Sequence, residues 1–174
     1  PAGGSLPYFV RAALEASDTL QDILDRAEGY PFIGGYGMIF CSRAERKAML
    51  VEAAGPEVRH REAPGPIFWN FNQYYDPDLI PLEQPGRRVL GYAPDRERLA
   101  SEFPAKAAYE LSDLPAFLRT QRDKDGVDYA WCGSRTAICN SHTQQTTIFD
   151  PDGDGFYFAA ACSFAGMAPI YHYH

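Results

Sequence analysis

Three strand-like runs follow one another within residues 35–63, and they constrain the fold more than any other feature of the sequence. The first two, GYGMIFCS and KAMLVEAAG, flank the polar turn RAER, which is the pattern of a β-hairpin. The third, EVRHREA, alternates in character and predicts a half-exposed strand. This region is therefore predicted to form a sheet of adjacent strands.

Two helices are predicted before these strands, within residues 7–28. Pro7 is tolerated in a first helical turn. The residues that follow place an apolar stripe at helical spacing: Phe9, Val10, Ala13 and Leu14. The sequence breaks near ASDT, where Thr19 is predicted to cap the second helix, and Gly29 is predicted to end it.

The middle of the chain mixes element types. PIFWNFNQY (66–74) predicts a continuation of the sheet, and the stretch 75–92, rich in Pro, Asp and Gly, predicts a loop. A helix is then expected to open at Asp95, with Arg96 and Arg98 in its first turn.

A further helix is predicted in LSDLPAFLRTQRD (111–123), and two or three strands are predicted within residues 136–163. Helices thus interrupt runs of adjacent strands instead of alternating with single strands. That order favours an α+β fold over a parallel sheet, and we expect one domain or subunit over residues 1–174.

The run DPDGDG within the last strands resembles the beginning of a calcium loop, with Asp150, Asp152 and Asp154 at alternate positions. Such a loop needs a carboxylate at its twelfth position, but Ala161 stands there. The flanking TTIF and FYFAA are strand-like, so the run predicts the turn of a hairpin. No metal site is expected here.

Composition excludes several classes of function. The net charge of −7, with no basic cluster, disfavours nucleic-acid binding. No stretch approaches the roughly 20 apolar residues that cross a bilayer, so we expect a soluble protein, with a cytoplasmic location slightly favoured. No glycine-rich phosphate loop is present, and no organic cofactor is expected. The spacing of the four cysteines does not suit zinc, and we expect them to be mostly buried, with one disulfide as the alternative.

The order of several segments resembles a known family: RAALEAS, DILDRAE, VEAAG, FWNFNQYYDPDL, DRERLASEF and ICNSHTQQTTIFDPDGDGFYFAA. It resembles the later half of the N-terminal-nucleophile (Ntn) amide hydrolases and acyltransferases of the isopenicillin N acyltransferase type. More distantly it is similar to choloylglycine hydrolases and penicillin V acylases. The resemblance covers nearly the whole chain and lies in order and spacing. It implies part of a four-layer αββα sandwich with antiparallel sheets, and acyl transfer from a small linear amide to water or an amine.

The resemblance also implies roles for individual residues. Asn72 falls on the family's asparagine, whose side-chain amide helps to form an oxyanion hole. Phe71 and Gln73 depart from the family's Thr and His on either side of it. Asn70 is a rival and a candidate for substrate binding, because residues two apart on a strand share a face. The alternative is that both asparagines satisfy backbone groups at the end of a strand.

Two further residues have weaker matches. Arg98 resembles the family's arginine that orders the site, and the alternative is a solvated helix arginine. Thr146 stands where the family often has a hydroxyl residue that lines the pocket.

The family's nucleophile is an N-terminal Cys, whose own α-amino group serves as the base. This sequence starts with Pro1, and Cys41, Cys132, Cys139 and Cys162 are all internal. We therefore expect a Cys-bearing segment of the same precursor, on a separate chain after autoproteolysis or outside this stretch. This chain alone would be inactive, and it would expose an apolar sheet edge or face to that partner. The alternative is a non-catalytic binding domain on the same scaffold.

Overall fold

The computed structural model describes residues 4–65, 67–83, 92–103, 110, 112–114, 145–149, 156–160 and 171–173. Of residue 92 and the strands from residue 145 onward, only the backbone is described. The chain divides into two compact units, Pro1–Arg88 (unit 1) and Val89–His174 (unit 2).

Unit 1 contains two helices followed by three strands. Its elements are α1 (Leu6–Ala16), α2 (Leu20–Glu28), β1 (Gly35–Ser42), β2 (Lys47–Ala54), β3 (Glu57–Glu62) and the short 3-10 helix η1 (Ile80–Leu82). Unit 2 contains α3 (Tyr92–Ser101), β4 (Gln145–Phe149), β5 (Phe156–Ala160) and β6 (Tyr171–Tyr173). Helices together with antiparallel three-stranded sheets make the chain α+β, as predicted.

The two N-terminal helices form where local sequence places them. Pro7 lies in the first turn of α1. At the start of α2 the Thr19 hydroxyl accepts the Asp22 N–H at 3.1 Å, and the Asp22 carboxylate accepts the Thr19 N–H at 2.9 Å. This reciprocal pair is a capping box. Gly29 is the C-cap residue of α2, so both predicted ends are confirmed.

The strands of unit 1 pair in the order β1-β2-β3, all antiparallel. The turn between β2 and β3 consists of Gly55 and Pro56, and Gly55 has a φ of 63°. Only glycine takes that conformation without steric cost, while proline suits the second turn position. The register places Glu52 of β2 between Gly37 of β1 and Arg59 of β3.

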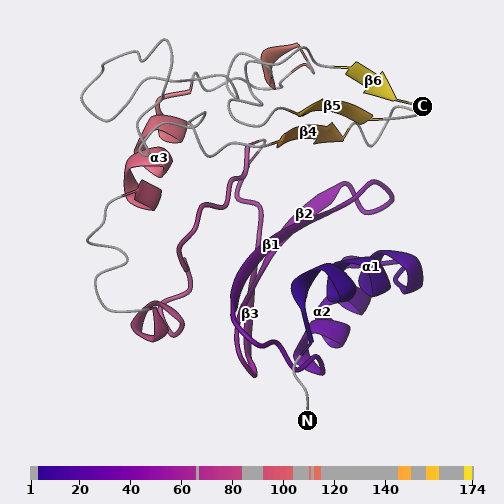
Figure 1. Cartoon of the computed structure of the whole chain (residues 1–174), viewed down its shortest axis with the longest axis vertical. Helices are drawn as coiled ribbons and strands as arrows, with labels where there is room; N and C mark the ends of the chain where they lie inside the picture. The colour runs from indigo at the N-terminus through magenta and orange to yellow at the C-terminus, as the bar shows by residue number, and fades with distance from the viewer. Residues whose placement is uncertain are drawn as a thin grey trace. The chain divides into compact units, whose positions relative to one another are not determined.

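The core of unit 1 lies between the helices and one face of this sheet (Figure 1). Its buried members from both layers are Phe9, Ala13, Leu20, Ile23, Leu24, Ala27, Phe32, Met38, Phe40, Met49, Val51 and Ala53. Phe9 is the aromatic centre, with ring centroids 5.0 Å from both Tyr30 and Phe32. The sheet residues of this core alternate along β1 and β2, so the residues between them point to the opposite face.

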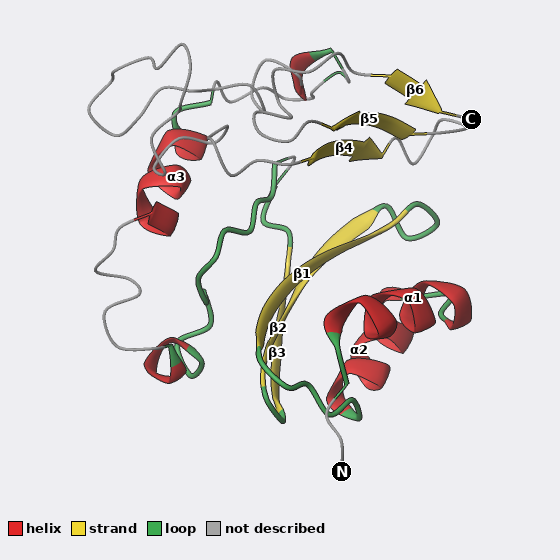
Figure 2. Cartoon of the chain, viewed as in Figure 1, coloured by secondary structure: helices red, strands yellow, loops and turns green. Residues whose placement is uncertain are grey.

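Residues 67–83, which we call the covering segment, run on the side of the sheet away from the helices (Figure 2). The N–H groups of Tyr75 and Asp76 in this segment donate to Glu52 on that face. Our prediction of a strand at 66–74 is wrong, because residues 67–75 are irregular. Several backbone N–H groups of this stretch are bonded to side chains instead of a neighbouring strand. The Tyr74 N–H donates to the Glu83 carboxylate, for example, and the Phe71 N–H donates to the Tyr75 hydroxyl.

In unit 2, β4 and β5 pair antiparallel, which confirms the hairpin predicted around DPDGDG. The turn itself, residues 150–155, lies outside the described residues, as does most of the helix predicted at 111–123. Helix α3 begins at Tyr92, three residues before the predicted start, because a proline at position 94 is compatible with a first turn. Arg98 consequently lies in its last turn and not its first. In the described part of the chain, no helix is long and apolar enough to span a membrane.

Candidate functional site

Two glycines of β1 let the covering segment approach the sheet closely. Gly35 and Gly37 are two residues apart and so share one face of the strand. A Cβ atom on Gly37 would lie 2.5 Å from Nδ2 of Asn70, and one on Gly35 would lie 2.2 Å from the Tyr74 hydroxyl oxygen. The Tyr74 hydroxyl donates to the Ala53 carbonyl at 2.8 Å, across this glycine face.

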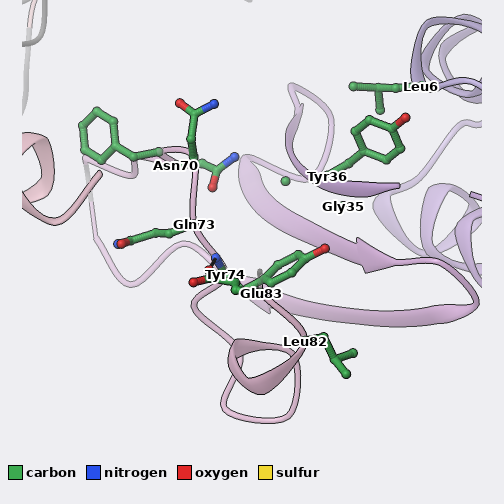
Figure 3. A pocket seen from close by; sticks show the side chains of 11 residues that line it. Leu6, Gly35, Tyr36, Asn70, Gln73, Tyr74, Leu82 and Glu83 are labelled. Carbon is green, nitrogen blue, oxygen red and sulfur yellow. Dashed lines mark hydrogen bonds between the residues drawn. The ribbon is translucent and has the colours of Figure 1, made fainter. Parts of the chain in front are cut away.

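A pocket of about 440 Å³ opens beside these glycines, and all its lining residues belong to unit 1 (Figure 3). Its walls come from β1, from residues 70–74, from Leu82 and Glu83, and from Leu6 of α1. The lining combines apolar and aromatic side chains with three side-chain amides: Asn70, Asn72 and Gln73. A cavity of this size with a few convergent polar groups suits a small-molecule ligand.

Both predicted asparagines line this pocket. The Oδ1 atom of Asn70 is buried and has no hydrogen-bond partner. Leaving a buried polar atom unpaired costs about 1–3 kcal/mol, so this oxygen calls for a donor, either an ordered water or a bound ligand. Asn72 is exposed at the pocket. The amides of Asn70 and Asn72 therefore differ in access to solvent.

Glu52 is the buried acid beneath the covering segment. Its side chain is 1% exposed, and its carboxylate accepts the N–H groups of Tyr75 at 2.7 Å and of Asp76 at 3.0 Å. Burial raises the pKa of Glu52, while the two backbone N–H groups and the nearby positive charge of Arg61 act in the opposite direction. A carboxylate that binds two consecutive N–H groups fixes the backbone between them.

Two arginines of β3 also contact the covering segment. The guanidinium carbon of Arg61 lies 4.4 Å from the ring centroid of Tyr75 and 4.9 Å from that of Phe68, both cation–π distances. The Nε atom of Arg59 lies 3.5 Å from the Asp78 carboxylate. The sheet therefore holds this segment by charge and aromatic contacts as well as by Glu52.

The other predicted site residues lie in unit 2. Arg98 is exposed and forms an i,i+4 ion pair with Glu102, which favours its alternative role as a solvated helix arginine. Thr146 lies on β4, where the structure describes only the backbone. The structure thus brings Asn70 and Asn72 together in one pocket, and it places Arg98 and Thr146 in the other unit.

Cys41 is the one cysteine among the residues that the structure describes. Cys41 is exposed, so the expectation of burial is wrong for it, because its side chain lies near the end of an edge strand. Partial burial of the thiol nevertheless raises the pKa of Cys41, which disfavours the thiolate. The other three cysteines lie outside the described residues. Within the described part, no cluster of His, Cys, Asp or Glu could hold a metal ion.

Sequence reasoning missed Glu52, Tyr75 and Glu83 as residues that shape the site. Glu52 gave a usable signal, since an isolated acid in the apolar run KAMLVEAA is unusual for a buried strand. Gly35 and Gly37 gave another, because glycines two apart in a strand mark a close approach of other atoms.

No protein-family model, curated protein or solved structure matches this chain.

Proposed function

We propose that this chain is part of an amide hydrolase or acyltransferase that uses an N-terminal Cys nucleophile, with an αββα sandwich of the isopenicillin N acyltransferase type. One observation carries the proposal. Asn72, which the resemblance matches to the family's asparagine, and its rival Asn70 line the same pocket, and Asn70 has a buried, unpaired oxygen. In most structures an asparagine with a purely structural role has its side-chain oxygen paired.

The proposed reaction begins when a cysteine thiolate attacks the carbon of a substrate amide. The carbonyl oxygen then becomes negatively charged, and the Asn72 side-chain N–H donates to it. The amine leaves with a proton from the α-ammonium group of the nucleophile, and water or a second amine takes the acyl group. One preorganised oxyanion donor is worth about 2.7–4 kcal/mol of transition-state stabilisation.

Asn70 is the proposed substrate-binding amide. Its buried Oδ1 is an acceptor, so it would bind an N–H group such as that of the substrate amide. The aromatic and aliphatic lining, which includes Tyr36, Phe71 and Leu82, would hold the acyl or amine portion. N-acyl amino acid derivatives, small peptide-like amides and β-lactam side-chain amides all have this combination of groups.

The nucleophile is proposed to come from a segment outside these 174 residues, because none of the internal cysteines has a free α-amino group. The test is to purify the protein with all the chains that accompany it, and to determine the intact mass and N-terminal sequence of each. We expect a companion chain that begins with Cys, and hydrolysis of chromogenic N-acyl anilides by the complex.

Variants then test the roles of the asparagines in that complex. Asn72→Ala is expected to lower kcat by about 100- to 1,000-fold, as removal of an oxyanion donor does. Asn70→Ala is expected to act mainly on KM. A single, well-folded monomeric species without amide turnover would contradict the proposal and favour the binding domain.

A further inference from the structure

A continuous series of contacts runs from the buried acid of β2 to the backbone between the two asparagines. The Glu52 carboxylate accepts the Tyr75 N–H at 2.7 Å. The Tyr75 hydroxyl in turn accepts the Phe71 N–H at 3.3 Å. Phe71 stands between Asn70 and Asn72 in the chain, so its backbone governs the direction of both side chains.

Tyr75 is held at both ends in this series. Its backbone is bonded to Glu52, and its ring lies against the guanidinium of Arg61 at 4.4 Å. With the backbone and ring both restrained, the hydroxyl has little freedom to move. It therefore offers the Phe71 N–H an acceptor at a defined place above the sheet.

Fold stability alone does not account for an acid at position 52. The Glu52 side chain is 1% exposed and lies on the central strand of the sheet. An apolar side chain at such a position stabilises a sheet by its burial, and Leu50 and Val51 on the same strand are examples. A buried charge has a large desolvation cost, and apolar residues of similar volume are often as stabilising or more so. What the carboxylate adds is two oxygens that fix two consecutive N–H groups of an irregular segment.

We propose that Glu52 and Tyr75 are positioning residues, which act through Phe71 to set the directions of the Asn70 and Asn72 amides in the pocket. The placement follows from the contacts above, and only the catalytic use of the amides depends on the proposed function. Neither Glu52 nor Tyr75 lines the pocket. Their loss is expected to lower kcat of the active complex about 10-fold, because small displacements of groups in a site have large effects on rate.

The experiment uses NMR of the full 174-residue chain labelled with ¹⁵N, which needs no substrate. Tyr75→Phe keeps the ring over Arg61 but removes the acceptor of the Phe71 N–H. Since a hydrogen bond contributes about 0.5–1.5 kcal/mol net, hydrogen exchange at Phe71 should accelerate about two- to tenfold. The side-chain NH₂ signals of Asn70 and Asn72 should shift in the same variant.

A matched control is Tyr30→Phe, because the Tyr30 hydroxyl also bonds to backbone, the Ser5 carbonyl, but in the helical layer. This variant should leave the Asn70 and Asn72 signals unchanged. A second variant, Glu52→Gln, offers one acceptor oxygen in place of two, and exchange at Tyr75 or Asp76 should accelerate. Its control is Glu62→Gln on the exposed ion pair with Lys47.

Two outcomes would overturn the proposal. In one, Tyr75→Phe and Glu52→Gln leave both asparagine signals unchanged. In the other, exchange accelerates equally at Phe71 and at Leu50 in the centre of the sheet, which would show that the residues hold the fold and not the site. Shifted asparagine signals in a complex without amide turnover would uphold the positioning role and refute the proposed chemistry alone.

Discussion

At the scale of single residues, Gly37 determines where the Asn70 amide can lie. A methyl group at Gly37 would come within 2.5 Å of the Asn70 side chain, which can rotate away because it is flexible. We therefore expect Gly37→Ala to displace Asn70 and shift its NH₂ signal. The free energy of unfolding should change by less than about 1 kcal/mol, because alanine is as easily accommodated as glycine in an extended strand.

The matched control for Gly37→Ala is Gly65→Ala, since no atom lies within 4 Å of a Cβ at Gly65. That variant should leave both the Asn70 signal and the stability unchanged. Equal spectra for Gly37→Ala and the wild type would show that Asn70 does not depend on the glycine face. Denaturant unfolding and ¹⁵N spectra of the three proteins decide the matter.

Glu52 gives a prediction of pH dependence, also at the residue scale. Its pKa is raised in the folded state by burial, so above the ordinary glutamate value of about 4.3 the folded chain binds more protons than the unfolded chain. The contribution of Glu52 to stability is therefore full below that pH, falls as pH rises through the raised pKa, and is constant beyond it.

Urea unfolding of the wild type and of Glu52→Gln between pH 4 and pH 8 measures this contribution. As pH rises, the unfolding free energy of the wild type should fall relative to that of Glu52→Gln. Parallel profiles would mean that Glu52 ionises alike in both states. Glu62→Gln is the control, because that carboxylate is exposed.

At the scale of elements, the capping box of α2 is the clearest local determinant. Thr19→Ala removes the acceptor of the Asp22 N–H and should lower the unfolding free energy by about 1 kcal/mol. Ser5→Ala is the matched control, because Ser5 is the N-cap of α1 but makes no side-chain capping bond. Thermal unfolding of both variants tests this, and equal losses would contradict the assignment.

The distance along the chain between interacting residues explains how much of the fold could be predicted from sequence. Thr19, Gly29 and the Gly55–Pro56 turn act through neighbours in the chain, and the elements they bound were predicted correctly. Residues 67–75 were predicted as a strand from their apolar pattern, but their backbone bonds go to Glu52 and Glu83. The pairing with Glu52, more than twenty residues away, cannot be inferred from the local pattern of residues 67–75, although the isolated acid is itself visible in the sequence.

The candidate site likewise contains residues that were predicted from sequence and residues that were missed. Asn72 was predicted from the order of segments and Asn70 from the alternation of a predicted strand. Both line the pocket, although residues 67–75 form no strand. The residues that hold them, Glu52 and Tyr75, were missed because their role appears only when β2 and the covering segment meet. Arg98 was predicted to lie in the first turn of its helix, but it lies in the last turn. The reason is that the helix begins at Tyr92 and not at Asp95, where the prediction placed its start.

At the scale of the whole molecule, unit 1 has its own core. Two helices pack on one face of its sheet and the covering segment contacts the other, and every residue that lines the pocket belongs to this unit. We therefore expect the fragment Pro1–Arg88 to fold alone. It should show one cooperative thermal transition, together with the Asn70 and Asn72 signals of the full chain.

Two leucine variants of this fragment make the test decisive. Leu24 is 5% exposed in the core, and Leu24→Ala should cost about 2–5 kcal/mol, enough to abolish the transition of a small unit. Leu14 is 65% exposed on α1, and Leu14→Ala should leave the transition in place. A fragment without a transition, or one equally sensitive to both changes, would show that the core of unit 1 forms only with the remainder of the chain. A fragment that behaves as expected would show that the pocket is a property of unit 1 itself.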